Sequence, residues 1–226
     1  MDEVCELYQQ ARNLAAEGIH VVSVDEKTGI QATERIAVTP MKSNQVARQD
    51  NEYVRHGTQC LIANLEVATG RILHPTVQET RTEQDFLEHV RNTVNTDFYG
   101  QWIFIADQLN THKSEALVHY VAQQCCIRED LGVKGKRGIL KTMESRMEFL
   151  SDPAHRIRFV YTPKHASWLN QIECWFSLIS KHLLRRLSAT SKSMLRDLIL
   201  RYIDYYNRVM AKPYQWMYRC KESRGN

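Results

Sequence analysis

The spacing of apolar residues changes from helical to strand-like within the first 25 positions. Apolar side chains recur at helical intervals over residues 3–16, and Gly18 is suited to end a helix. Residues 20–24 then form an apolar, β-branched run that stops at Asp25. We expect a lead-in helix followed by a buried strand with Asp25 at its carboxyl end.

A second apolar run repeats this arrangement. Residues 101–106 predict another buried strand, which stops at Asp107. If the two strands are parallel neighbours, their carboxylates meet at one edge of the sheet. Aspartate is also common where a strand enters a turn, so either residue taken alone is better explained as a turn residue.

The remaining pattern predicts a hairpin and further helices. Residues 59–67 and 71–77 flank Gly70, whose access to positive φ suits a short antiparallel turn, and Thr82 or a neighbour caps a helix to about residue 95. We then expect a helix to about 127, a mobile loop over 132–138, a short helix within 139–150, a strand over 157–161, and long helices over about 167–187 and 191–209. This order predicts an α/β fold, a mixed sheet flanked by helices.

Composition narrows the class of protein. The 226 residues are 43% hydrophobic, enough for one buried core, and they contain no run of about eighteen apolar residues that could cross a membrane. The acidic start of the chain does not resemble a signal peptide. The six cysteines lack the spacing of zinc ligands. We expect a cytoplasmic protein with reduced thiols and no membrane partner.

Charge is distributed unevenly along the chain. Residues 1–133 contain 11 Lys and Arg against 19 Asp and Glu, whereas residues 134–226 contain 19 against 7. A basic C-terminal part suits a polyanion such as DNA, because Lys and Arg contact phosphates. The same charges would also suit a solvated basic helical surface.

A third acidic candidate, Glu173, lies beside an apolar helical stripe. The stripe includes Ile172, Trp175 and Phe176, and Glu173 falls next to it. Periodicity alone therefore makes Glu173 an ordinary solvated glutamate.

Three segments resemble the signature blocks of bacterial insertion-sequence transposases of the mariner-like DDE superfamily. They are residues 24–29, 106–113 and 161–176. The likeness extends over nearly the whole chain, including the Gly- and Lys-rich stretch and residues 211–216. It implies an RNase H-like catalytic domain over 20–210, preceded by a lead-in helix or linker over 1–19 and followed by a C-terminal tail over 211–226.

The resemblance assigns Asp25, Asp107 and Glu173 as the catalytic, metal-binding carboxylates. It implies two Mg²⁺ ions per site, with Mn²⁺ able to substitute, and Mg²⁺ prefers oxygen ligands. Two such ions would activate a water or a 3′-hydroxyl and stabilise the leaving oxygen. The expected activity is DNA strand cleavage and strand transfer, as in transposition, recombination and integration.

Polar residues close to these carboxylates in sequence are candidates for DNA contacts. We expect phosphate positioning by His112, Lys113, Lys164, His165 and Asn170. The loop residues Lys134, Lys136 and Arg137 would follow the DNA backbone electrostatically. A surface or capping role is the alternative for each residue near the carboxylates.

The chain departs from the family pattern in two places. Gln108 stands where Asn usually follows the second aspartate, and 65 residues separate Asp107 from Glu173, about twice the usual number. An insert over about 128–156 accounts for the longer spacing.

The partners that the resemblance implies include a recognition module. The residues before the first strand are too few for the N-terminal helix-turn-helix of relatives, so we expect that segment to be removed, separately encoded or lost by truncation. The expected partners are double-stranded DNA, at element ends and target, and a second copy in a homodimer at the bacterial nucleoid. Two alternatives stay open: an RNase H-like nuclease acting on RNA–DNA hybrids, and a non-catalytic remnant that binds DNA or dimerises.

Overall fold

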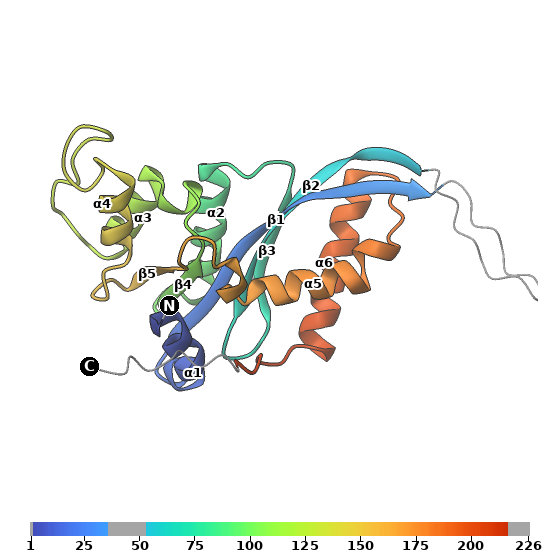
Figure 1. Ribbon diagram of the computed structural model, residues 1–226, viewed down its shortest axis with the longest axis horizontal. Helices are drawn as coiled ribbons and strands as arrows, with labels where there is room; N and C mark the ends of the chain where they lie inside the picture. Colours follow the sequence, from blue (N-terminus) through green and yellow to red (C-terminus); the bar gives the residue numbers. More distant parts are fainter. Residues whose placement is uncertain (1, 36–52, 217–226) are drawn as a thin grey trace, which may run out of the picture.

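One mixed sheet organises the molecule, and the computed structural model describes residues 2–35 and 53–216 of it (Figure 1). Within these ranges five strands pair in the order β3-β2-β1-β4-β5. The strands are β1 (Ile19–Arg35), β2 (Tyr53–Glu66), β3 (Ile72–Gln78), β4 (Gln101–Ala106) and β5 (Ile157–Tyr161). The helices are α1 (Asp2–Ala16), α2 (Glu83–Val94), α3 (Glu115–Gln124), α4 (Met143–Leu150), α5 (Ile172–His182) and α6 (Lys192–Val209). Short 3₁₀ turns are η1 (Asn95–Asp97), η2 (Thr111–Lys113), η3 (Ser167–Leu169) and η4 (Leu184–Arg186).

The expected fold class, an α/β arrangement with a mixed sheet flanked by helices, is confirmed. β1 runs parallel to β4, and β4 runs parallel to β5. The β1–β2 and β2–β3 pairs are antiparallel, so the predicted hairpin is also correct. Gly70 closes that hairpin with φ of +72°, and a Cβ on it would lie 2.0 Å from the carbonyl oxygen of Lys212.

The prediction that the first strand ends at Asp25 is wrong, because β1 continues to Arg35. Lys27 pairs with Leu61 and Ile30 with Gln59, so β1 advances by one more residue than β2 between these pairs. Gly29 lies in this interval with φ of +68°, and a bulge of this kind absorbs one extra residue without ending a strand. β1 and β2 therefore continue beyond the shared sheet as a two-stranded ribbon (Figure 1).

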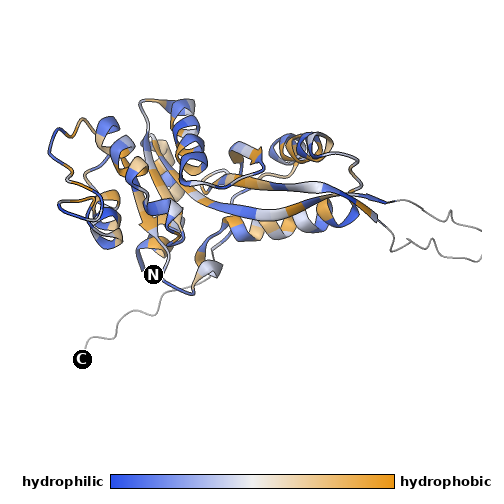
Figure 2. Cartoon of the chain, turned by 90° about the horizontal axis from the view of Figure 1, so that it is seen from above, coloured by the Kyte–Doolittle hydropathy of each residue, from blue (hydrophilic) through white to orange (hydrophobic). Residues whose placement is uncertain are grey.

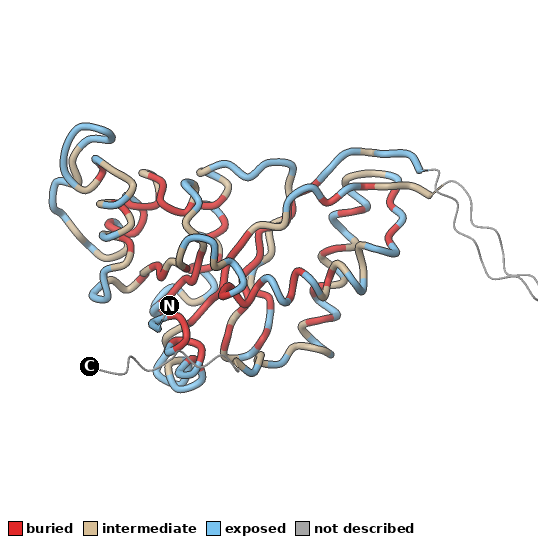
Figure 3. The backbone as a smooth tube through the Cα atoms, in the orientation of Figure 1, coloured by how far each residue is buried: buried red, intermediate tan, exposed pale blue. Residues whose placement is uncertain are grey.

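Helices cover both faces of the sheet. α2, α3 and α4 pack on the face that carries Val22 and Phe104. On the other face, α1 packs against Val21 and Ile105, and α5 and α6 pack against residues of β2 such as Leu61. Figures 2 and 3 show apolar and buried residues concentrated along the strands, with polar and exposed residues on the outer sides. Neighbouring residues of β1 thus face different helices.

The helix expected over 167–187 is shorter than predicted. Its α-helical part begins at Ile172, because Asn170 has an extended backbone with φ of −81° and ψ of 106°. It ends at His182, before the separate turn η4. The start of α5 is therefore determined by the hydrogen bond from Asn170 to β1 and not by helix propensity.

The other predicted helices are present with small differences in length. α2 begins after its N-cap Thr82 as expected, and the short helix within 139–150 is α4. The helix expected to reach 127 ends at Gln124, and the exposed Cys126 follows it with φ of 57°. Among the described helices, none combines the length and the apolar character that a membrane span requires.

Candidate active site

Asp25 and Asp107 occupy equivalent positions on two neighbouring parallel strands. The last pair in the β1–β4 register joins Ser23 to Ile105, and each aspartate follows its strand's member of that pair by two residues. Residues two apart along a strand share a face. The two aspartates therefore lie at the same edge of the sheet, as predicted for neighbouring parallel strands.

Asp25 is almost fully buried, with 6% of its surface exposed, and two further acidic residues lie near it. Burial raises the pKa of Asp25 to about 7, and the charges of Asp107 and Glu173 act in the same direction. The backbone N–H of Glu26, which donates to Asp25 Oδ1 at 2.7 Å, opposes this rise. Three acidic groups thus influence one another at this edge.

Buried hydrogen bonds fix the amino end of α5 to β1. Asn170 donates from Nδ2 to the carbonyl oxygen of Val24 at 2.9 Å and to Asp25 Oδ2 at 3.3 Å. Ser23 Oγ donates to Asn170 Oδ1 and accepts from the backbone N–H of Ile172 at 2.9 Å. These bonds place the first turn of α5, which carries Glu173, beside Asp25.

Tyr8 of α1 also holds the segment that precedes α5. The hydroxyl of Tyr8 donates to the carbonyl oxygen of Leu169 at 2.7 Å and accepts from the backbone N–H of Gln171 at 3.2 Å. Tyr8 is 7% exposed, and desolvation raises its pKa above the usual range. The lead-in helix is therefore built into the architecture of the site.

The donor set suits a hard divalent cation, although its side chains do not yet converge. Carboxylate oxygens are the ligands that Mg²⁺ prefers, and a cation would relieve the repulsion that contributes to the raised pKa of Asp25. Over residues 2–35 and 53–216, no three His, Cys, Asp or Glu side chains are close enough around one point to hold a metal ion. Glu173 is exposed, so its side chain is free of the packing that would prevent it from rotating towards Asp25.

Asp107 is held by a buried histidine. His112 Nδ1 lies 2.8 Å from Asp107 Oδ1, and the backbone N–H of Leu109 donates to the same oxygen at 3.0 Å. His112 Nε2 lies 3.2 Å from Glu26 Oε1. Burial raises the pKa of Asp107, but the bonds from His112 and Leu109 outweigh it and lower that pKa overall. Burial likewise lowers the pKa of His112, and its two carboxylate partners overcome this effect and raise it to about 9.

Two of the residues expected to position phosphate, His112 and Asn170, are buried. The His112 side chain is 0% exposed and both of its ring nitrogens face carboxylates, so a phosphate contact would require one of those bonds to break. Asn170 is also 0% exposed, and its bonds go to β1. In this geometry both side chains support the aspartates, and the DNA contacts expected of them stay a prediction.

Lys113 and Lys164 keep the expected position beside the carboxylates. Lys113 is 7% exposed, with Nζ 5.9 Å from the centre of the Tyr161 ring. Burial lowers the pKa of Lys113, and the charge of the exposed Lys164 contributes in the same direction. His165 is exposed and has φ of 63°. Lys113 and Lys164 can present positive charge to a phosphate near Asp107.

The basic loop residues lie at the α3–α4 end of the molecule (Figure 1). Lys134 is exposed and pairs with Glu115 at 3.9 Å, Arg137 pairs with Asp130, and Lys136 is exposed. Val133 and Arg137 form an isolated β-bridge that closes the loop into a turn. These residues stay candidates for electrostatic contact with a DNA backbone.

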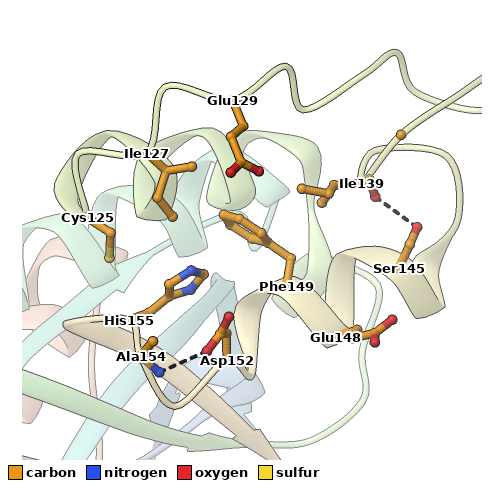
Figure 4. Close-up of a pocket in the computed structure, with 11 residues that line it drawn as sticks. Cys125, Ile127, Glu129, Ile139, Ser145, Glu148, Phe149, Asp152, Ala154 and His155 are labelled. Carbon is orange, nitrogen blue, oxygen red and sulfur yellow. Dashed lines mark hydrogen bonds between the residues drawn. The ribbon is translucent and has the colours of Figure 1, made fainter.

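A hollow of about 800 Å³ beside α4 lies apart from the carboxylate edge. Figure 4 shows Phe149 and His155 on its wall, with ring centres 4.6 Å apart, and Glu129 and Asp152 also line it. Asp25, Asp107 and Glu173 are not among its lining residues. An open sheet edge is a better match for a long polymer than this hollow, so the candidate site stays at the edge.

Sequence reasoning missed Glu26, Ser23 and Tyr8 as supports of the site. Glu26 follows Asp25 directly and therefore points to the opposite face of β1. A strand continuing past Asp25 would have indicated this, but the turn-like residues 27–29 concealed it. Ser23 and Tyr8 carried no signal, because their partners lie about 150 residues away.

A family model described as DDE superfamily endonuclease matches residues 20–196. No curated protein sequence matches the chain. The match covers most of the chain and includes all three candidate carboxylates. The chain therefore belongs to the DDE superfamily of endonucleases.

Several solved structures of a mariner transposase are similar to this chain. The Mos1 transposase paired-end complex with left transposon end is 12% identical, with a TM-score of 0.48, and the match covers 92% of this chain and 53% of that one. The Mos1 mariner paired end complex with Mn is 13% identical, with a TM-score of 0.35 and coverage of 90% and 58%. The complex with Mg is 10% identical, with a TM-score of 0.29 and coverage of 95% and 64%. The chain thus spans less than two thirds of each Mos1 chain.

Proposed function

We propose that this DDE superfamily endonuclease is the catalytic domain of a DNA transposase, which cleaves DNA strands and transfers them in a reaction that depends on divalent metal. The observation that carries the proposal is the shared register of Asp25 and Asp107, with the first turn of α5 docked beside them. The family match supports the endonuclease class. The resemblance of residues 24–29, 106–113 and 161–176 to transposase signature blocks supports transposition in particular.

In the proposed mechanism the three carboxylates act as ligands and not as nucleophiles. Asp25, Asp107 and Glu173 would hold Mg²⁺ or Mn²⁺, two ions per site, which supply activation of the attacking water or 3′-hydroxyl and stabilisation of the leaving oxygen. The buried Asp25 fixes one side of the site, whereas the exposed Glu173 can close on it from the first turn of α5. Lys113 and Lys164 would hold the phosphate beside Asp107.

The proposed substrate is double-stranded DNA at transposon ends and at the target. Joining two ends requires two active sites, so we propose that the chain acts as a homodimer. A helix-turn-helix segment outside this chain would recognise the sequence of the ends.

Metal-dependent nicking of terminal-inverted-repeat DNA tests the proposal directly. Wild-type protein should nick the duplex in the presence of Mg²⁺ or Mn²⁺. Asp107→Asn should lower the rate by about 100-fold or more, because a metal ligand contributes several kcal/mol and each 1.4 kcal/mol changes a rate about tenfold. Asp204→Asn is the matched control, since Asp204 is exposed and pairs only locally with Arg208 on α6.

Three results would count against the proposal. Undiminished nicking by Asp107→Asn would remove the assigned mechanism. Preferential cleavage of an RNA–DNA hybrid would replace the transposase by an RNase H-like nuclease, and salt-dependent DNA binding without any cutting would indicate a non-catalytic remnant.

A further inference from the structure

The consecutive acidic residues Asp25 and Glu26 point in opposite directions. Asp25 faces α5 through its contact with Asn170. Glu26 faces η2 and α2, where its side chain is 1% exposed and lies 3.2 Å from His112 Nε2. A buried carboxylate is costly unless it is paired. The Glu26–His112 pair is therefore a buried ion pair and not a surface one.

The hydrogen-bond geometry fixes the role of the His112 ring. One ring nitrogen faces Glu26 and the other faces Asp107, and carboxylates only accept hydrogen bonds, so both nitrogens must donate. The ring cannot turn freely, because its centre lies 4.2 Å from that of Phe86. Its backbone is also held, since Tyr161 donates from its hydroxyl to the carbonyl oxygen of His112 at 2.7 Å.

The bonds to Asp107 leave one of its oxygens available. The His112 ring and the Leu109 N–H both approach Oδ1. A carboxylate held at one oxygen has a fixed plane, so the direction of Oδ2 is set as well. The Asp107 side chain is 29% exposed, which leaves it accessible from the open edge.

We propose that Glu26 and His112 are positioning residues, which hold the Asp107 carboxylate in the orientation that binds the catalytic metal. This inference rests on the proposed function. Outer partners of metal-binding side chains orient them, and their loss typically lowers metal affinity by about 10- to 100-fold. Glu26 is then excluded from the ligand set, although it is adjacent to Asp25 in sequence.

Binding of Mn²⁺ in the absence of DNA tests this role without a measurement of catalysis. His112→Asn should weaken Mn²⁺ binding by about 10- to 100-fold in titration calorimetry. Glu26→Gln is the milder variant, because it keeps an acceptor for Nε2 and removes only the charge, and a smaller loss is expected. A thermal melt of each variant establishes that it is folded.

The chain offers a matched control on the same strand. Glu34 pairs with His56 Nε2 at 2.8 Å on the ribbon, and both side chains are partly exposed. Glu34→Gln and His56→Asn remove the same chemistry away from the aspartates, so Mn²⁺ affinity should stay within about twofold of wild type. The controls separate a general effect of losing a Glu–His pair from an effect on Asp107.

DNA nicking at increasing Mn²⁺ distinguishes positioning from direct participation. High Mn²⁺ should restore much of the rate of His112→Asn, because its ligands are intact, whereas Asp107→Asn should not recover. Unchanged Mn²⁺ affinity in His112→Asn together with weaker DNA binding would overturn the inference and return His112 to a DNA-contact role. Wild-type protein that neither binds Mn²⁺ nor nicks DNA would instead contradict the proposed function itself.

Discussion

The regions around Asp25 and Asp107 differ sharply, although the two residues are equivalent in strand register. Asp25 lies in a buried, uncharged network of side-chain and backbone hydrogen bonds, and its pKa is raised to about 7. Asp107 is partly exposed and bonded to a cationic ring, and its pKa is lowered. Equivalent backbone positions therefore do not produce equivalent ligands, because the supporting elements decide the charge of each carboxylate.

The difference indicates separate roles for Asp25 and Asp107. Asp107 is ionised over the physiological range and ready to bind a cation. Asp25 keeps its negative charge at a cost in the metal-free protein, which a cation would relieve. The following predictions test this contrast, beginning with the largest expected effect.

The stability of the metal-free protein should fall as pH rises, through Asp25. The folded-state pKa of about 7 lies above the ordinary aspartate value of 3.8, so the folded protein binds this proton more tightly than the unfolded chain does. The contribution is fully present below about pH 4 and lost by about pH 7, with an upper bound on the order of 4 kcal/mol. Chemical denaturation from pH 4 to 8 measures it.

Asp25→Asn provides the comparison for that pH series. The difference between the wild-type and variant curves should widen in favour of the variant as pH rises, and saturating Mg²⁺ should narrow it. A constant difference from pH 4 to 8 would contradict the electrostatic contrast between the two aspartates.

Asp107→Asn should have the opposite effect on stability near neutral pH. The variant loses the charge that pairs with the buried His112 ring, and a buried charged donor left with a poorer partner costs about 1–3 kcal/mol. Thermal melts in a metal chelator at pH 7.5 measure this. Equal shifts for Asp25→Asn and Asp107→Asn would show that the two regions are not distinct.

Ser23→Ala should lower the free energy of unfolding by about 1 kcal/mol, through contacts beside Asp25 and not beside Asp107. The hydroxyl bridges Asn170 and the backbone N–H of Ile172, so its loss loosens the attachment of α5 to β1. Ser180→Ala is the control, because Ser180 Oγ bonds only to the carbonyl oxygen of Phe176 within α5. Hydrogen exchange at the first turn of α5 should increase in Ser23→Ala, and no increase would mean that other contacts hold the helix.

Patterns of apolar residues were sufficient to predict the strands. They placed the two aspartates at one sheet edge only on the condition that the strands are parallel neighbours, which the β1–β4 pairing satisfies. They could not predict that β1 passes Asp25, because Lys27, Thr28 and Gly29 have the composition of a turn whether they form a turn or a bulge. The start of α5 was also hidden, since Asn170 leaves helical geometry to bind a strand far away in sequence. Local preference specifies an element type, whereas distant partners specify its ends.

The supports of the site could be predicted least. Glu26 and His112 are 86 positions apart in sequence, and only the packing of η2 against β1 brings them together. The expected DNA contact by His112 came from its place beside Asp107, and burial of the ring was not visible in the pattern. Proximity in sequence thus identified His112 as a neighbour of Asp107, but it could not show that the ring also contacts Glu26.

The bonds that attach α5 and α1 to the site have a consequence for folding. Ser23 and Asn170 are 147 positions apart, and Tyr8 and Leu169 are 161 apart. Contacts between such distant positions close large loops, whose entropy must be lost before the contacts form, and proteins rich in them fold slowly. We therefore expect the carboxylates to come together late in folding, when the chain from α1 to α5 is already in place.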